Sequence, residues 1–137
     1  MTTILVVEDD DDLRMLVRWS LEAEGFEVYC ASDGNQALEA IFRIRPDLAI
    51  LDWMLPNLEG LAVCRMVREA NRQVGTPVIL VTGRAEDEDL RRGMAAGADS
   101  YLTKPFSMDV LIERVRDVLG RTAQPNDDVG SPSPVNR

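Results

Sequence analysis

The first apolar run of the chain, at residues 4–7, is followed by five consecutive carboxylic acids at residues 8–12. Their mutual repulsion would be relieved by a hard divalent cation such as Mg²⁺, which suggests a metal site that begins with Glu8 and Asp9. Acidic residues are also favoured in the first turn of a helix, where they interact with the macrodipole, and this alternative accounts for Asp11 and Asp12. The run alone does not distinguish a metal site from a helix start.

Three further polar residues stand at the ends of candidate strands: Asp52 and Thr82 directly after apolar runs, and Lys104 after the weaker candidate at residues 100–103. Each has an ordinary explanation when it is taken alone, as a turn aspartate, a threonine that ends a strand, and a surface lysine. Together with the acidic run, however, they supply metal ligands, a nucleophile, a hydroxyl donor and a cation. This combination indicates phosphoryl transfer, in which positioning and charge neutralisation do most of the work.

The apolar runs before these residues are predicted to be β-strands, because they are short and rich in β-branched residues. Five strands are expected, at residues 4–7, 27–31, 48–51, 78–81 and 100–103. The first, third and fourth are apolar throughout, which predicts central strands buried on both faces, and the mixed second run predicts an edge strand. Helical patterns alternate with the strands, so we expect an α/β fold with a parallel sheet. Ligands of such sheets bind beyond the carboxyl ends of the strands, where the polar residues should converge.

Apolar residues recur at helical spacing in three of the intervening segments, and each stripe is expected to pack on the sheet. The stripes are Leu13, Leu16, Val17 and Leu21; Ala37, Ile41 and Ile44; and Leu111, Val115, Val118 and Leu119. Gly25 and Gly97 are expected just past the ends of helices. Asp33 with Gln36 resembles a capping box, and Ser107 can cap the last helix.

A chain of 137 residues with 45% hydrophobic residues is suited to one domain with a single core. From Gln124 onward, Pro, Asn, Asp, Gly and Ser dominate without periodicity. We therefore expect a domain at residues 1–121 and a disordered C-terminal tail at residues 122–137.

The formal net charge of -9 argues against direct binding of nucleic acid or anionic membranes by this segment. No apolar run approaches the ~20 residues needed to cross a bilayer, and a signal-like start is missing, so we expect a cytoplasmic protein. The chain has no histidine, so any phosphohistidine chemistry requires a second protein. Cys30 and Cys64 lack CxxC spacing and are expected to be buried free thiols.

The motifs at the strand ends resemble those of response regulator receiver domains, the phospho-acceptors of two-component signalling. They are ILVVEDD at residues 4–10, LDWMLP at 51–56, VTG at 81–83 and GADSYLTKPF at 97–106. The resemblance spans residues 3–120 and depends on the order and separation of four residues, namely Asp9, Asp52, Thr82 and Lys104. It implies a flavodoxin-like (CheY-like), doubly wound sheet of five parallel strands in the order 2-1-3-4-5. The first and fifth helices would cover one face, and the second to fourth helices the other.

The resemblance also implies a role for each candidate residue at the metal and phosphoryl site. Asp52 would be the phospho-acceptor and would bind Mg²⁺ or Mn²⁺ directly with Asp9, whereas Glu8 would act through a metal-bound water. The main-chain carbonyl of Met54 would complete the protein ligands. Lys104 would neutralise a phosphoryl oxygen.

A switch is implied as well, in which Thr82 moves toward the phosphoryl group and Tyr101 rotates inward. The surface of the fourth helix and the strand at residues 100–103 would then change. From residue type alone, Tyr101 would be a half-buried strand aromatic with its hydroxyl in water.

The implied phosphoryl donor is a histidine kinase or a phosphotransfer protein. The domain would catalyse its own phosphorylation without turning over a free substrate, so we do not expect a conventional enzyme. The motifs most resemble receivers that are attached to winged-helix DNA-binding domains. Since these residues contain no such domain, a stand-alone receiver and a fragment both stay open.

Receivers of that type pair through the fourth helix, fifth strand and fifth helix, and a homodimer of this kind is expected. The charges available on these elements are Arg91, Arg92, Asp99, Arg114 and Arg116. Ser100 stands where many relatives have a second aspartate, which weakens one expected ion pair between subunits.

Two residues beside the site are expected to set how long the phosphoryl group persists. Met54 cannot orient an attacking water by hydrogen bonding, and Arg84 would shield the phosphoryl group. Slow self-dephosphorylation is therefore predicted.

Two other functions stay open at this point. An aspartate-nucleophile phosphatase of the haloacid-dehalogenase type would carry its nucleophile within Asp9 to Asp12, and it would normally need a cap insert that so short a chain lacks. A receiver-like interaction module that is never phosphorylated would be expected to lack one of the four key residues, and none is missing.

Overall fold

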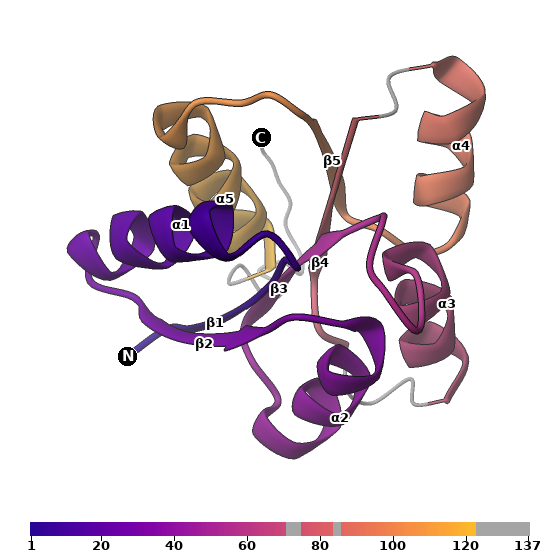
Figure 1. Cartoon of the computed structure of the whole chain (residues 1–137), viewed down its shortest axis with the longest axis horizontal. Helices are drawn as coiled ribbons and strands as arrows, with labels where there is room; N and C mark the ends of the chain where they lie inside the picture. The colour runs from indigo at the N-terminus through magenta and orange to yellow at the C-terminus, as the bar shows by residue number, and fades with distance from the viewer. Residues whose placement is uncertain (71–74, 84–85, 123–137) are drawn as a thin grey trace, which may run out of the picture.

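The computed structural model describes residues 1–70, 75–83 and 86–122, in which strands and helices alternate (Figure 1). The strands are β1 (Thr3–Val7), β2 (Glu27–Ala31), β3 (Leu48–Asp52), β4 (Val78–Thr82) and β5 (Ser100–Thr103). The helices are α1 (Asp11–Ala23), α2 (Gly34–Ile44), α3 (Gly60–Ala70), α4 (Asp87–Ala95) and α5 (Met108–Thr122). All five strands lie within a residue of their predicted bounds.

The strands form one parallel sheet in the order β2-β1-β3-β4-β5, which confirms the predicted fold class. Helices α1 and α5 cover one face, and α2, α3 and α4 lie on the other (Figure 1). This topology places β1 beside β3 at the centre of the sheet, so the ends of these two strands meet.

Two apolar clusters hold the layers together, one on each face of the sheet. Successive residues of a strand point to opposite faces, so Ile4 and Val6 join the cluster under α1 and α5, whereas Leu5 and Val7 join the one under α2 and α3. Every residue of β3 and β4 is buried, as expected for central strands with both faces covered.

Two expectations about burial were wrong. Cys30 is exposed, because β2 is an edge strand in which only Val28 and Ala31 are buried; Cys64 is buried as predicted. Leu16 of the first helical stripe is 48% exposed, because it lies about 100° around the helix from Val17, which faces the sheet.

The predicted helix ends are confirmed, with one difference in detail. Gly25 and Gly97 have φ values of +94° and +105° just past α1 and α4. Asp33 accepts a hydrogen bond from the main-chain N–H of Gln36 at 2.8 Å, but the Gln36 side chain bonds back to Ser32 rather than to Asp33. The second bond of the capping box, to the side chain of Gln36, is therefore made by the main-chain N–H of Ser32, one residue before Asp33. Ser107 caps α5 by accepting from the N–H of Val110 at 3.1 Å.

Helix α5 continues to Thr122, and the rest of the predicted tail, residues 123–137, lies outside the described residues. The expected domain boundary therefore stays a prediction. Among the described helices, none combines the length and the apolar character that crossing a membrane requires.

Candidate functional site

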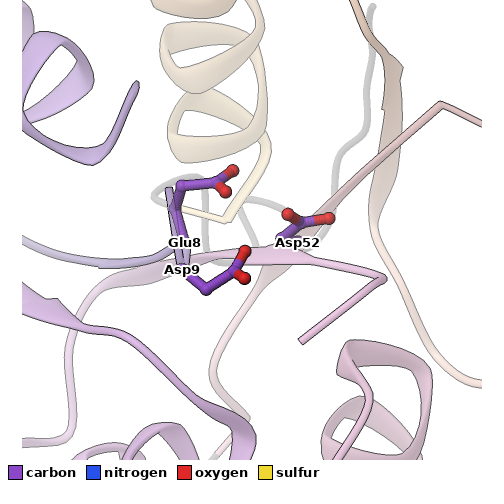
Figure 2. A group of neighbouring side chains, drawn as sticks. All are labelled: Glu8, Asp9 and Asp52. Atoms are coloured by element: carbon purple, nitrogen blue, oxygen red, sulfur yellow. The ribbon is translucent and has the colours of Figure 1, made fainter. Parts of the chain in front are cut away.

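Three carboxylates meet where β1 and β3 end side by side. Val7 pairs with Leu51 in the sheet, so Glu8 and Asp9 emerge next to Asp52. Oxygen atoms of the three side chains lie within 4.8 Å of one another, and the Glu8 and Asp9 side chains extend toward Asp52 (Figure 2). Glu8 and Asp52 are buried, whereas Asp9 is open to solvent. The three carboxylates expected at the metal site, Glu8, Asp9 and Asp52, thus form one cluster.

The side chain of Lys104 completes this cluster from the far side of β4. Its Nζ donates to Oδ2 of Asp52 and to Oε1 of Glu8, with both distances at 3.0 Å. Lys104 follows the edge strand β5, and its main-chain N–H is fixed to the carbonyl of Thr82 at 2.7 Å. One ammonium therefore bridges two buried carboxylates at the centre of the site.

Burial and nearby charges shift the pKa values of Glu8 and Lys104. Burial raises the pKa of Glu8, and the nearby charge of Asp52 adds to this, although hydrogen bonds from the Asp10 N–H and Lys104 oppose it. Partial burial lowers the pKa of Lys104, but the hydrogen bonds and charges of Glu8 and Asp52 outweigh it and leave that pKa raised. The ammonium consequently stays charged at neutral pH, and Glu8 holds its proton more tightly than an exposed glutamate does.

The main chain around Asp52 is held on both sides. Oδ1 of Asp52 accepts from the N–H of Met54 at 3.1 Å, which orients the carboxylate toward the loop before α3. The N–H of Trp53 donates to the carbonyl of Val81 at 2.8 Å, and the N–H of Gly60 donates to the carbonyl of Trp53 at 2.9 Å. The loop that carries Met54 thus turns back onto the strand end.

Two glycines permit this loop to lie so close. A Cβ atom on Gly60 would stand 2.1 Å from the carbonyl oxygen of Asp52, and one on Gly34 would stand 1.8 Å from that of Leu58. The loop is also tied to the start of α2 by a hydrogen bond from Asn57 Nδ2 to Asp33 Oδ2 at 3.0 Å. Any side chain at either glycine would push the loop away from the site.

The two predicted switch residues lie on neighbouring strands. Thr82 is the last residue of β4 and is fully buried, and its register partner is Thr103. Tyr101 of β5 is half-buried, and its ring meets that of Trp53 edge-on, with centroids 6.4 Å apart and planes at 85°. Tyr101 is thus a half-buried strand aromatic, as its residue type suggested.

The two predicted tuning residues differ in what the structure describes. The Met54 side chain is 59% exposed beside Asp52. Arg84 lies outside the described residues, so its predicted shielding role stays a prediction.

Two arginines contribute contacts that sequence reasoning missed. Arg14 donates to the carbonyl of Glu8 at 2.8 Å and pairs with Asp11 at 2.6 Å, which fixes the end of β1 to α1. Arg92 of α4 holds its guanidinium 5.3 Å from the centroid of the Trp53 ring. The i,i+3 spacing of Asp11 and Arg14 was a readable signal, but nothing in the sequence pointed from Arg92 to Trp53.

Most charges expected to face a second subunit make contacts within the chain. Asp99 accepts from Arg68 at 2.9 Å and from the N–H of Val78 at 2.8 Å. Arg114 donates to the Ser100 hydroxyl at 3.1 Å and to the Tyr101 carbonyl at 2.7 Å. These charged side chains are therefore less available to a second subunit than their positions in the sequence suggested.

Arg116 likewise pairs with Glu24 and lies over the ring of Phe26. The contact joins α5 to the turn that follows α1. Arg92, another of the charges expected at the interface, lies over the Trp53 ring. Arg91, by contrast, is exposed to solvent.

Comparison with known proteins agrees with this geometry. The family profile for the response regulator receiver domain matches residues 4–116. The phosphate regulon transcriptional regulatory protein PhoB of Rhizobium meliloti is 45% identical over 118 residues, which are 86% of this chain and 52% of that protein. The chain thus spans about half the length of this curated relative.

Two solved receiver structures are similar throughout the domain. The receiver domain of the Francisella response regulator 1452 has a TM-score of 0.83 and 34% identity, and the match covers 89% of this chain and 99% of that one. The receiver domain of the Pseudomonas aeruginosa sensor histidine kinase PA1611 has a TM-score of 0.79 and 30% identity, covering 87% and 98%. That structure carries a magnesium ion coordinated in its active site cleft.

Proposed function

The chain belongs to the response regulator receiver domain family of two-component systems, and on that basis we propose that Asp52 is its phosphoryl acceptor. The observation that carries the proposal is the Lys104 ammonium, 3.0 Å from both Asp52 and Glu8, beside the exposed carboxylate of Asp9. A buried nucleophile, a cation and a cluster of hard oxygen ligands are the parts that phosphoryl transfer requires.

The donor set is suited to Mg²⁺ or Mn²⁺, since both cations prefer oxygen ligands and the three carboxylates lie within 4.8 Å of one another. Asp9 and Asp52 would hold the ion directly, Glu8 would do so through water, and the Met54 carbonyl would complete the protein ligands. A bound divalent ion supplies charge neutralisation between two anions that must approach each other.

The residues of the chain then act by position and charge. An oxygen of Asp52 bonds to the phosphorus of a partner's phosphohistidine, and the histidine nitrogen leaves with the electron pair of the broken bond. The product is an acyl phosphate on Asp52. Lys104, already directed at Oδ2 of this carboxylate, donates to a phosphoryl oxygen. The chain itself contains no histidine, so the donor is a histidine kinase or a phosphotransfer protein.

The signal leaves the site through Thr82 and Tyr101. Thr82 ends the strand beside β3 and moves toward the phosphoryl group, and Tyr101 turns inward into the space it vacates. The face formed by α4, β5 and α5 changes as a result and meets an output partner or a second copy of the chain. The relatives are transcriptional regulatory proteins of which the matched region is 52% and 57%, which favours an output on DNA by a domain outside this segment.

The domain is a switch that promotes its own modification and does not turn over a free substrate. Its acyl phosphate is long-lived, because the exposed side chain of Met54 offers no hydrogen bond to an attacking water. A cytoplasmic location accords with histidine kinases as donors.

The contacts of the acidic run argue against a phosphatase with its nucleophile after β1. Asp10 caps α1 by accepting from the N–H groups of Asp12 and Leu13, and Asp11 pairs with Arg14. These carboxylates are therefore used in starting the helix. Within the range Asp9 to Asp12, none of the described contacts is with Lys104, which donates to Asp52 and to Glu8.

Intact-mass measurement after treatment with acetyl phosphate and Mg²⁺ tests the proposal. The wild-type chain should gain ~80 Da, corresponding to one PO₃H group, and the gain should need Mg²⁺. Asp52→Asn should abolish it, whereas Asp11→Asn should leave it intact as a matched control. A gain that persists in Asp52→Asn, or hydrolysis of p-nitrophenyl phosphate with turnover, would refute the assignment.

A further inference from the structure

Trp53 joins the acidic site to the opposite layer of the fold. It directly follows Asp52, and its side chain is 1% exposed within the apolar cluster under α2 and α3. Its main-chain N–H and carbonyl are both hydrogen-bonded, to Val81 and Gly60. A shift of the main chain at Asp52 therefore has to be passed on to this ring, because close-packed interiors transmit displacements.

Helix α4 is only partly covered, since its apolar side chains Leu90 and Met94 are 40% and 46% exposed. Its buried residue is Gly93, which packs closely enough on the sheet that a Cβ there would meet Leu80 and the Tyr101 ring at 3.2 Å. The guanidinium of Arg92, the preceding residue, lies over the Trp53 ring at 5.3 Å. Because the large apolar side chains of the helix are only partly covered, the cation–π contact adds to what holds the helix there.

The same indole ring also meets Tyr101 edge-on at 6.4 Å. Trp53 thus touches two of the three elements of the output face, α4 through Arg92 and β5 through Tyr101. Arg92 also lies 3.8 Å from Asp89, but that pair is within one helix and partly solvated, so it does not link α4 to the sheet.

We propose that Arg92 is a positioning residue that, by stacking on Trp53, holds α4 in the arrangement belonging to unmodified Asp52. This inference rests on the proposed function, since it takes Asp52 as the group that is modified. Modification moves the main chain next to Trp53, the stacked contact is lost, and α4 is released. Removing the guanidinium in advance makes the phosphorylation-competent arrangement more populated.

The expected size of the effect follows from the contact. A cation–π pair of this exposure changes a conformational equilibrium by about two- to fivefold. Arg92→Met should therefore be phosphorylated by acetyl phosphate about two to five times faster than the wild type. Arg92→Lys keeps a cation over the ring and should restore most of the wild-type rate.

Initial rates of phosphorylation with acetyl phosphate and Mg²⁺, measured by intact mass, provide the test. Arg65→Met, at an exposed arginine of α3, is the control for loss of a surface charge. A double-mutant cycle assigns the effect: Arg92→Met should be silent when Trp53 is replaced by Leu, and should keep most of its effect with Trp53→Tyr, which retains a ring. The second variant carries the test if Trp53→Leu does not fold.

The outcomes separate the two proposals. A wild-type chain that gains no mass refutes the phospho-acceptor assignment itself. A wild-type chain that is phosphorylated, with Arg92→Met equal to or slower than it, overturns the positioning role alone. The same holds if Arg92→Met accelerates the reaction equally with Trp53 and with Leu at that position.

Discussion

Lys104 Nζ lies 3.0 Å from Asp52 Oδ2, although Asp52 ends β3 and Lys104 follows β5, with β4 between the two strands. The contact is made because all parallel strands of the sheet end at the same edge, so a long side chain from β5 can reach across the end of β4. The ammonium neutralises part of the charge of the cluster. It also competes electrostatically with any cation that binds there, and this gives the first prediction.

Replacement of Lys104 by Met should affect metal binding and phosphorylation in opposite directions. Without the ammonium, the cluster loses one positive charge, so Mg²⁺ should bind several times more tightly. Phosphorylation by acetyl phosphate should fall by about tenfold or more, since a charge-assisted hydrogen bond to the phosphoryl group is worth about 1.5–3 kcal/mol. Trp53 fluorescence in a Trp19→Phe background can report Mg²⁺ binding, and intact mass the phosphorylation. Parallel losses of both would contradict this separation of roles.

Mg²⁺ should bind more weakly as the pH is lowered. Because of Glu8, this loss of affinity should begin at a higher pH than it would with a glutamate of ordinary pKa. Burial raises the pKa of Glu8 above 4.5, so its carboxyl takes up a proton sooner as the pH is lowered, and the protonated form no longer attracts the ion. Lys104 has a raised pKa and stays charged throughout this range, so it does not contribute. Mg²⁺ titrations between about pH 5 and 8 should show this dependence, and it should be smaller in Glu8→Gln. Glu39→Gln, on the exposed side of α2, is the control.

The raised pKa of Glu8 also determines how the stability of the metal-free chain changes with pH. The folded chain binds a proton at Glu8 more readily than the unfolded chain, so this residue makes the free energy of unfolding fall as the pH rises from 4.5 to the raised value. Glu8→Gln should remove that component. Denaturant unfolding in the presence of a chelator can measure it, and an unchanged pH profile in the variant would contradict the assignment to Glu8.

Gly60→Ala should destabilise the fold and disturb the site together. The new methyl group would stand 2.1 Å from the Asp52 carbonyl oxygen, which is main chain and cannot move without its strand. A cost of about 1–3 kcal/mol in unfolding free energy is expected, with slower phosphorylation. Gly120→Ala is a matched control, because a Cβ at that position in α5 meets nothing within 4 Å. The control should be slightly stabilising, by about 0.5–1 kcal/mol.

The two cysteines should differ sharply in reactivity. Cys30 is exposed on the edge strand, and partial burial of its thiol raises its pKa. Cys64 is buried, and burial raises its pKa to about 11. Iodoacetamide at about pH 8 should therefore label one thiol in the native chain and two after unfolding. Peptide mapping should place the native label on Cys30, and Cys30→Ser should remove it. Rapid native labelling of Cys64 would contradict the burial described for α3.

The sequence was sufficient to predict the sheet and the meeting of Asp52 and Lys104 at its edge, and the reason is physical. Central strands are buried on both faces and must be apolar throughout, so the ends of the runs at residues 48–51 and 78–81 could be read directly. Once the strands are parallel, Asp52 and Lys104 must lie at one edge whatever the details of packing. Local helix signals such as Ser107 act within a few residues, and were equally readable.

Contacts between distant elements could not be read in this way. An arginine on a polar helix such as α4 gives no sequence signal that it will stack on Trp53, because the contact depends on how the helix lies on the sheet. Cys30 was misjudged because residue type outweighed its position on an edge strand. The close approach that Gly60 permits depends on a turn of the whole loop back onto Asp52.

Met54→Asn should shorten the lifetime of the acyl phosphate. The Met54 side chain is 59% exposed next to Asp52, so an amide there would be free to hydrogen-bond an attacking water without displacing packed atoms. One such bond is worth about 0.5–1.5 kcal/mol, which corresponds to a rate increase of about two- to tenfold. The loss of ~80 Da after removal of acetyl phosphate measures the decay. Met66→Asn, at an exposed methionine of α3, should decay like the wild type. Unchanged or slower decay in Met54→Asn would mean that this residue does not limit access of water to the phosphoryl group.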